Sequence, residues 1–411
     1  MTADERRASF SLASIFALRM LGLFLVLPVF ALEAAHYPGG SDPALVGLAL
    51  GMYGLVQAVF QAPLGMASDR FGRKKVIVLG LLVFAAGSVA GALATSVYGL
   101  MAGRALQGAG AISAAVTALL ADQTRDEVRT KGMALVGASI GLMFALSLLA
   151  APPLANWLGG LSGLFWLTGA LSLAGVALVV WVTPVEPAHR PHETHGMTEA
   201  PAPTGVWRHP LLWRLYLGIF VLQAVQMAMW VVVPSLLVAA GLQKAEHWHV
   251  YLPAVLASFV LLGGLFAMER RGHLSLALRG SIMLYLLVQL VFFQITLRPS
   301  GLWTLGGALF LFFVAFNAIE ASLPSLVSRL APQAVRGQAL GVFNTSQSLG
   351  LFAGGALGGW LLRAHGAASV FVAGTVLAAL WLALGWRQVV RPPAHAMANT
   401  ATNTPAGTPN A

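Results

Sequence analysis

The sequence contains no cysteine and few charged residues. Of its 411 residues none is Cys, and 9% are Asp, Glu, Lys or Arg. Without cysteine the chain cannot form disulfides, thiolate-ligated metal sites or thiol nucleophiles. Soluble proteins carry about 25% charged residues, so this chain has too little charge for an ordinary water-facing surface. The composition therefore argues against a soluble enzyme, a disordered protein and a nucleic-acid-binding domain.

Long apolar runs take the place of charge. Hydrophobic residues make up 58% of the chain, and a transmembrane helix needs about 20 consecutive residues of this kind. Twelve runs satisfy this length: 10–32, 44–67, 75–94, 97–121, 131–155, 161–183, 211–240, 247–268, 275–297, 301–328, 336–362 and 367–386. The pattern predicts an all-α polytopic membrane protein with 12 transmembrane helices.

Lys and Arg are distributed unevenly between the two ends of these spans. With the N-terminus placed in the cytoplasm, 19 of them fall on the cytoplasmic side, 3 on the other side and 2 inside spans. This bias predicts that both termini are cytoplasmic. It also accounts for the formal charge of +10 without nucleic acid. The first run is too long for a signal peptide and contains Arg19, so we expect a retained helix.

The chain divides into two halves that resemble each other. We expect four segments: an N-terminal six-helix half at 1–183, a cytoplasmic linker at 184–210, a C-terminal six-helix half at 211–391 and a disordered tail at 392–411. The linker holds six Pro and four His; its irregular His spacing favours a solvated linker over a metal site. Asp69–Gly72 echoes Glu269–Gly272 at an offset of 200 residues. Duplicated halves of this kind are typical of transporters, related by pseudo-two-fold symmetry.

Two motifs identify the family that the sequence resembles. Residues 65–75 read GMASDRFGRKK, which resembles the G-x-x-x-D-R-x-G-R-[KR] motif of the major facilitator superfamily, in the second cytoplasmic loop. Residues 104–108 read RALQG, which resembles the R-x-x-Q-G motif of proton-coupled members. Within the superfamily the chain resembles YajR-type transporters of the drug:proton antiporter branch, on the residues Phe16–Gly22, Glu246–Trp248 and Phe312–Asn317. The resemblance implies the major facilitator fold and transport of a small molecule.

The sequence departs from that branch in two places. The antiporter motif that this branch carries in span five has several glycines and ends in Gly-Pro. The corresponding positions in this sequence are Ala138, Ser147, Ala151 and Pro152. All are small, so close helix packing is preserved, but the direct sequence argument for antiport is weaker. YajR-type chains can also carry a soluble C-terminal domain, where this sequence has a short polar tail.

The resemblance implies a conformational latch in the loop motif. Asp69 would interact with the N-terminus of span eleven around Gly337 and Gly341, where a helix dipole favours negative charge, and Arg73 would pair with Asp122. The alternative is that these charges only anchor the loop and set topology. The candidate latch residues are Gly65, Asp69, Arg70, Gly72, Arg73 and Asp122.

Three charged residues lie well inside the spans: Arg19, Arg104 and Glu320. A buried charge in a span is expensive and is a functional candidate by default. Glu320 is the leading candidate for the proton carrier, with Arg19 as a partner across the cavity and Arg104 assigned to proton coupling by the resemblance. The alternatives for Glu320 are a structural salt bridge or a buried acid whose hydrogen bonds are satisfied, and the alternative for Arg104 is helix-packing hydrogen bonds. Glu33 is expected to be a solvated rim residue.

Several amides share helix faces with these charges at spacings of three or four residues. We expect Asn317, Gln107, Gln223 and Gln226 to line a substrate cavity. For Gln57, Gln61, Asn344 and Gln347 we expect helix–helix contacts, and for His247 and His249 an interfacial position.

The sequence favours a secondary transporter that exports small lipophilic or drug-like compounds in exchange for protons. A proton symporter or facilitator that imports a small metabolite stays open, and a membrane scaffold without transport is less consistent with the intact loop motif. No phosphate-binding loop is present, so a nucleotide-driven pump is excluded. We expect a monomer in a bacterial inner membrane, with substrate, protons and lipid as partners, and with no cofactor, metal or enzymatic activity.

Overall fold

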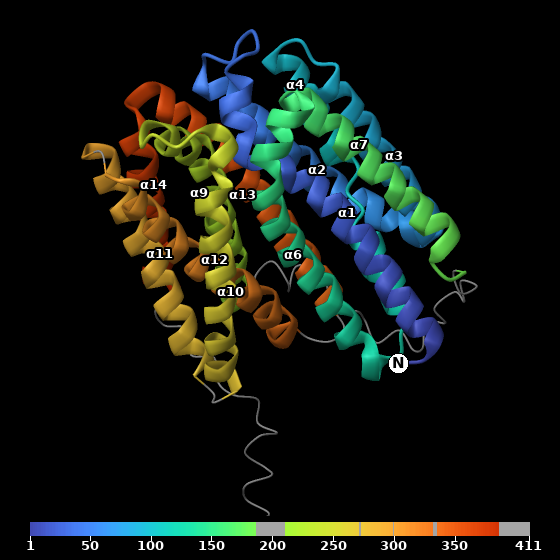
Figure 1. Cartoon of the computed structure of the whole chain (residues 1–411). Coiled ribbons are helices and arrows are strands. Elements are labelled where there is room, and N and C mark those ends of the chain that lie inside the picture. The colour runs from blue at the N-terminus through green and yellow to red at the C-terminus, as the bar shows by residue number, and fades with distance from the viewer. Residues whose placement is uncertain (186–209, 271–272, 299, 332–334, 386–411) are drawn as a thin grey trace, which may run out of the picture.

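The computed structural model describes residues 1–185, 210–270, 273–298, 300–331 and 335–385, and these form helices joined by short turns (Figure 1). The first half contains α1 (Ala3–Ala34), α2 (Pro43–Phe71), α3 (Arg73–Ala92), α4 (Val97–Ala109), α5 (Ser113–Asp122), α6 (Asp126–Leu158), α7 (Leu161–Ala177) and the π-helical turn η1 (Leu178–Val182). The second half contains α9 (Pro210–Ala239), the 3-10 turn η2 (Lys244–Glu246), α10 (Trp248–Arg270), α11 (Leu274–Leu297), α12 (Leu302–Leu330), α13 (Arg336–His365) and α14 (Ala367–Gly385). The expected linker and tail lie mostly outside the described residues.

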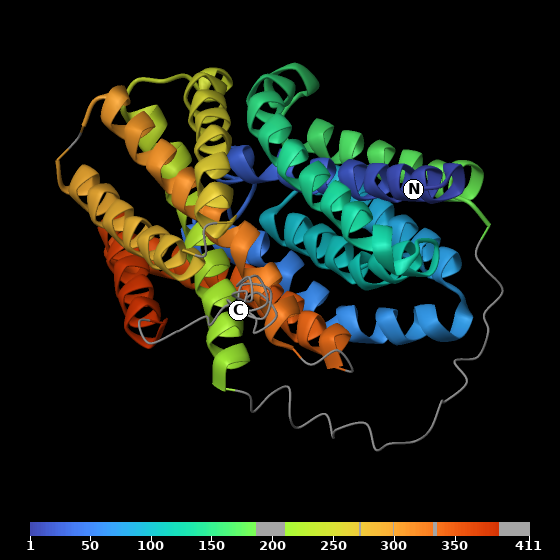
Figure 2. The ribbon, with the colours of Figure 1, turned by 90° about the horizontal axis from the view of Figure 1, so that it is seen from below.

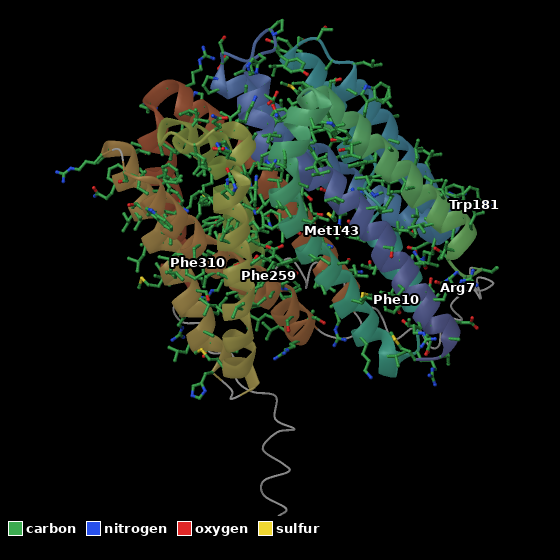
Figure 3. The ribbon with its side chains drawn as sticks, viewed as in Figure 1. Arg7, Phe10, Met143, Trp181, Phe259 and Phe310 are labelled. Carbon is green, nitrogen blue, oxygen red and sulfur yellow. The ribbon has the colours of Figure 1, made fainter. Side chains whose placement is uncertain are left out.

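The predicted all-helical polytopic fold is confirmed. In the described part of the chain, 11 helical segments are long and apolar enough to cross a membrane. The twelfth expected span, α13, is a continuous helix whose glycines and amides make it less apolar. Large apolar side chains such as Phe10 and Trp181 are exposed on the outside of the bundle (Figure 3), as a lipid-facing surface requires.

The fourth span differs from the continuous helix that its composition predicts. It is interrupted between Ala109, the last residue of α4, and Ser113, the first residue of α5. A broken membrane helix needs other partners for its free backbone groups. One is supplied by Arg19, which donates to the carbonyl oxygen of Gly110.

The two ends of the bundle are named here by their connections. The linker side carries the ends of the two halves that flank residues 186–209, together with the α2–α3 turn at Gly72. The far side carries the α1–α2 and α9–α10 connections. Seen from the linker side, the helices of the two halves form two groups, with α2 and α13 between them (Figure 2).

Backbone contact between α2 and α13 joins the halves. A methyl group on Gly47 of α2 would lie 2.2 Å from the carbonyl oxygen of Gly355 in α13, and one on Gly355 would lie 2.5 Å from the oxygen of Gly47. Gly51 and Phe352 continue this contact toward the middle of the helices. Small residues at these positions let the two helix backbones touch, as in other membrane helix pairs.

A second set of glycines attaches α13 to its own half. A methyl group on Gly354 would lie 2.1 Å from the carbonyl oxygen of Ala224 in α9, and one on Gly350 would lie 2.5 Å from the oxygen of Phe220. One face of α13 therefore contacts α9 and another contacts α2. The helix lies at the boundary between the halves.

Within the residues that the structure describes, two ion pairs connect the halves at the far side. Lys244 Nζ of η2 lies 2.5 Å from Glu33 Oε1 of α1, and Arg363 Nη1 of α13 lies 2.8 Å from Asp42 Oδ2 before α2. Glu33 is 9% exposed, so the expected solvated rim position is wrong: the paired carboxylate is almost completely covered. Together with the α2–α13 contact, these pairs describe a conformation that is closed at the far side.

Candidate functional site

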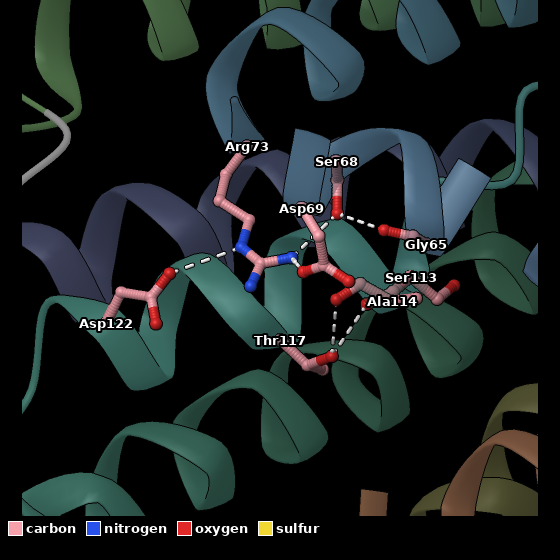
Figure 4. Close-up of polar contacts among 8 residues, drawn as sticks. All are labelled: Gly65, Ser68, Asp69, Arg73, Ser113, Ala114, Thr117 and Asp122. Atoms are coloured by element: carbon pink, nitrogen blue, oxygen red, sulfur yellow. Dashed lines mark hydrogen bonds and ion pairs between the residues drawn. The ribbon is translucent and has the colours of Figure 1, made fainter. Parts of the chain in front are cut away.

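The loop motif forms a compact polar cluster at the linker side (Figure 4). Arg73 Nε lies 3.2 Å from Asp122 Oδ2, and Arg73 Nη1 donates to Ser68 Oγ at 2.8 Å and to the Asp69 carboxylate. Ser68 donates in turn to the carbonyl oxygen of Gly65 at 2.7 Å. Arg73 therefore joins the end of α2, the start of α3 and the end of α5.

Glycine is required at the turn that presents this cluster. Gly72 has φ +100°, a backbone conformation that other residues rarely adopt, and it separates α2 from α3. Gly65 is less constrained, because a methyl group there would make an ordinary 3.5 Å contact with Ala114. Arg70 is exposed, with its guanidinium 5.5 Å from the centre of the Phe71 ring.

The expected partner of Asp69 is not in contact with it in this conformation. A methyl group on Gly337 or Gly341, at the start of α13, would meet no described atom within 4 Å. Asp69 instead accepts a hydrogen bond from Arg73. The latch across the halves stays a prediction for a conformation that is closed at the linker side, the opposite of the one described.

Arg19 is buried inside the first half. It is 1% exposed, and its Nη2 donates to Tyr53 Oη at 3.1 Å and to Gly110 O at 3.2 Å, while the guanidinium lies 5.4 Å from the centre of the Phe84 ring. These contacts place it at the interruption of the fourth span. The expected partnership with Glu320 is not made in the described structure.

Arg104 forms a second buried group near the same tyrosine. Its guanidinium lies 5.0 Å from the centre of the Tyr53 ring, and Nη1 donates to Gln107 Oε1 at 3.1 Å. Gln107 Nε2 donates to Ser88 Oγ at 2.9 Å. Both Arg104 and Gln107 are fully buried, so Gln107 holds α4 against α3 here rather than lining an open cavity.

Glu320 lies in the second half and is held by amides from two other helices. Gln223 Nε2 of α9 donates to Glu320 Oε2 and Gln347 Nε2 of α13 donates to Glu320 Oε1, each at 2.9 Å. Glu320 itself is partly exposed. The two neutral amide N–H donors can hold Glu320 as a carboxylate. Each amide also carries an oxygen that can accept a hydrogen bond from the protonated carboxyl.

The other amides lie around this group in different roles. Asn317 donates to Ser258 Oγ at 2.8 Å and so joins α12 to α10, while Gln226 is 6% exposed. Gln347 was expected to make only helix contacts, and its bond to Glu320 makes it a site residue. His247 lies at the far-side start of α10, where it is fully buried and its ring contacts that of Tyr251.

The charges of the two halves are thus separated. The first half buries two guanidinium groups around Tyr53, and within the described residues neither has an ion-pair partner. The second half has one partly exposed carboxyl held by amides. Among the residues that the structure describes, no group of three His, Asp or Glu side chains could hold a metal ion, and the His-rich stretch lies outside them.

Comparisons with known proteins agree with this architecture. The sequence profile of the Major Facilitator Superfamily matches residues 12–355. The chain is 44% identical to the inner membrane transport protein YajR of Escherichia coli K12, over 93% of this chain and 83% of the relative. It is 26% identical to multidrug resistance protein 2 of Bacillus subtilis, over 92% and 94% of the two chains.

The fold is shared with solved transporter structures at lower sequence identity. The crystal structure of a D-xylose–proton symporter has a TM-score of 0.71 and 17% identity, covering 93% of this chain and 97% of that one. The profile match spans most of the sequence, and the similarity to YajR covers most of both chains. The protein therefore belongs to the major facilitator superfamily of secondary transporters.

Proposed function

We propose that the protein exports small lipophilic compounds from the cytoplasm in exchange for protons, by alternating access, with Glu320 as the proton carrier. The observation that carries the proposal is the environment of this carboxyl. It is partly exposed and receives one amide hydrogen bond from α9 and one from α13, each at 2.9 Å. Similarity to a multidrug resistance protein supports the substrate class.

The geometry supports a simple exchange cycle. We place the linker side in the cytoplasm, so the far-side-closed conformation gives cytoplasmic access to Glu320. Loss of its proton leaves a carboxylate that Gln223 and Gln347 stabilise and that attracts a substrate. Opening at the far side then exposes the site to external protons, and protonation of Glu320 releases the substrate there. One group thereby couples both fluxes.

Arg19 and Arg104 act in this cycle as buried positive charges. Both contact Tyr53 in α2, the helix that also carries the far-side contact with α13. The positive charge of these two guanidinium groups repels a cationic substrate from the first half, so the substrate is directed to Glu320. The loop motif, with Asp69 free to exchange Arg73 for the start of α13, latches the opposite conformation.

Everted membrane vesicles with an acidic interior test the proposal. A quenched dye reports the gradient while lipophilic cations, neutral drugs and sugars are added in turn. We expect one compound class to restore fluorescence, and Glu320→Gln to abolish this effect while the protein is still inserted. The matched control is Glu246→Gln, which neutralises an exposed acid in η2 and should leave exchange unchanged.

The alternatives give different results in the same membranes. Exchange that persists in Glu320→Gln keeps antiport but removes Glu320 as the carrier. A proton symporter, which the altered small-residue pattern of span five keeps open, leaves the gradient of everted vesicles intact. It instead makes the medium of right-side-out vesicles more alkaline when substrate is added.

A further inference from the structure

A cluster of aromatic rings joins the two halves near the middle of the bundle. Phe144 of α6 lies 5.2 Å from Phe24 of α1 in the first half, measured between ring centres. It also lies 6.0 Å from Phe313 and 6.4 Å from Phe316, both on α12 in the second half. Phe144 thus provides an aromatic contact between the first half and α12.

This cluster lies next to the candidate proton site. Phe316 and Glu320 are four residues apart on α12, so they share one face of the helix and are separated by about 6 Å along its axis. Because α12 runs from the far side to the linker side, Phe316 lies closer to the far side than the carboxyl of Glu320 does. On this face of α12, aromatic rings from both halves therefore lie next to Glu320, in the direction of the far side.

Burial separates the two parts of this face. Phe144 and Phe316 are each 6% exposed, whereas Glu320 is partly exposed. The rings therefore close the space between the halves at the level just beyond the carboxyl. In the proposed exchange cycle, a compound bound at Glu320 would therefore lie next to this cluster.

We propose that Phe144 and Phe316 are specificity-determining residues that contact the transported compound. Favoured substrates would combine an aromatic ring with a cationic group about one helical turn away, the ring against Phe144 and Phe316 and the cation at Glu320. Aromatic rings attract each other in edge-on and offset arrangements beyond the effect of buried area. This inference rests on the proposed function, since it takes Glu320 as the polar end of the site.

The test compares two amines that differ only in aromaticity. Radiolabelled 2-phenylethylammonium and 2-cyclohexylethylammonium have the same charge, similar size and a ring about 5 Å from the nitrogen, close to one helical pitch. Their dissociation constants are measured by equilibrium dialysis against the full-length protein in lipid nanodiscs. We expect a preference of about threefold to tenfold for the phenyl compound, as aromatic pairing predicts.

Substitution locates the origin of the preference. Phe144→Leu and Phe316→Leu should each bring the ratio of the two dissociation constants close to one. Phe371→Leu, which removes a ring stacked on Phe292 at 5.2 Å between α14 and α11, should leave the ratio unchanged. Two independent variants keep the test valid if one of them fails to fold.

The outcomes separate this inference from the proposed function. Equal loss of affinity for both amines in Phe144→Leu, or a preference that survives both substitutions, would show that the cluster only seals the halves. Aromatic preference in binding without proton exchange in vesicles would keep the inference and overturn the proposed function. Proton exchange without aromatic preference would keep the proposed function and overturn this inference. If neither binding nor exchange is seen, both the inference and the proposed function are overturned.

Discussion

The contact between α2 and α13 predicts that one methyl group will change which conformation the protein adopts. In the far-side-closed conformation, a Cβ at Gly47 would lie 2.2 Å from the carbonyl oxygen of Gly355. The Cβ is fixed directly to the α2 backbone and the oxygen belongs to the α13 backbone of the other half, so no side-chain rotation relieves the clash. Gly47→Ala should therefore disfavour this conformation relative to one in which the far side is open.

The size of the effect follows from the cost of overpacking. Inserting a methyl group into a tightly packed contact costs about 1–3 kcal/mol. If the whole cost falls on the far-side-closed conformation, the ratio of closed to open molecules decreases by roughly 5-fold to 150-fold. A protein that is about 99% closed would then become between about 5% and about 60% open.

Spin labels can measure this shift because the sequence has no cysteine to remove. Ser41 before α2 and Gln243 before η2 are both exposed and lie at the far side in different halves. Cysteines at these two positions, labelled in lipid nanodiscs, report the distance across the far side by double electron–electron resonance. Gly47→Ala should increase the population of longer distances.

A matched substitution separates conformational choice from general destabilisation. A methyl group on Gly354 would lie 2.1 Å from the Ala224 oxygen, but this contact lies within the second half. Gly354→Ala should lower thermal stability without moving the distance distribution. The same distribution in Gly47→Ala as in the unsubstituted protein, or an equal shift in Gly354→Ala, would refute the reasoning.

Three further results are expected. Glu33→Lys and Lys244→Glu should each lengthen the same far-side distance by removing the ion pair, and the double exchange should restore it; a double variant as open as the singles would contradict a specific pairing. Asp122→Asn should change the free energy of unfolding by less than about 1 kcal/mol, because its pair with Arg73 is partly exposed, yet slow substrate exchange in vesicles if the loop cluster has the proposed latch role. Arg104→Lys should destabilise the protein by about 1–3 kcal/mol in thermal unfolding, because lysine cannot reproduce the guanidinium hydrogen bonds to Gln107 and to the carbonyl oxygen of Leu50 together with the stacking on Tyr53.

The helices and the loop cluster could be predicted because their information is local. Apolar runs of about 20 residues mark spans wherever they occur, and Gly72 marks a turn by its own sequence context. Arg104 and Gln107 are three residues apart on one helix, so their hydrogen bond could be expected from spacing alone. In the loop cluster, the motif sets Asp69 and Arg73 close together in the chain, whereas the pairing of Arg73 with the distant Asp122 was implied by the family resemblance.

The partners of Glu320 could not be read from the sequence in the same way. Gln223 and Gln347 come from α9 and α13, and their roles depend on which helices are neighbours in the fold. Similar amides, such as Asn317, form bonds between helices instead. The interruption of the fourth span was missed because its residues, Gly110, Ala111 and Ile112, are as apolar as the span around them, and the contact from Arg19 that accompanies it joins distant parts of the chain.

The two glycine faces of α13 have a consequence for how the protein enters the membrane. Each contact with α2 or α9 places a hydrogen atom where an apolar side chain would otherwise be, so the helix is less hydrophobic than its neighbours. Insertion of a nascent helix depends on the summed transfer free energy of its own side chains. During synthesis α13 would therefore enter the bilayer with help from α9, already in place, and the boundary between the halves is completed late in biogenesis.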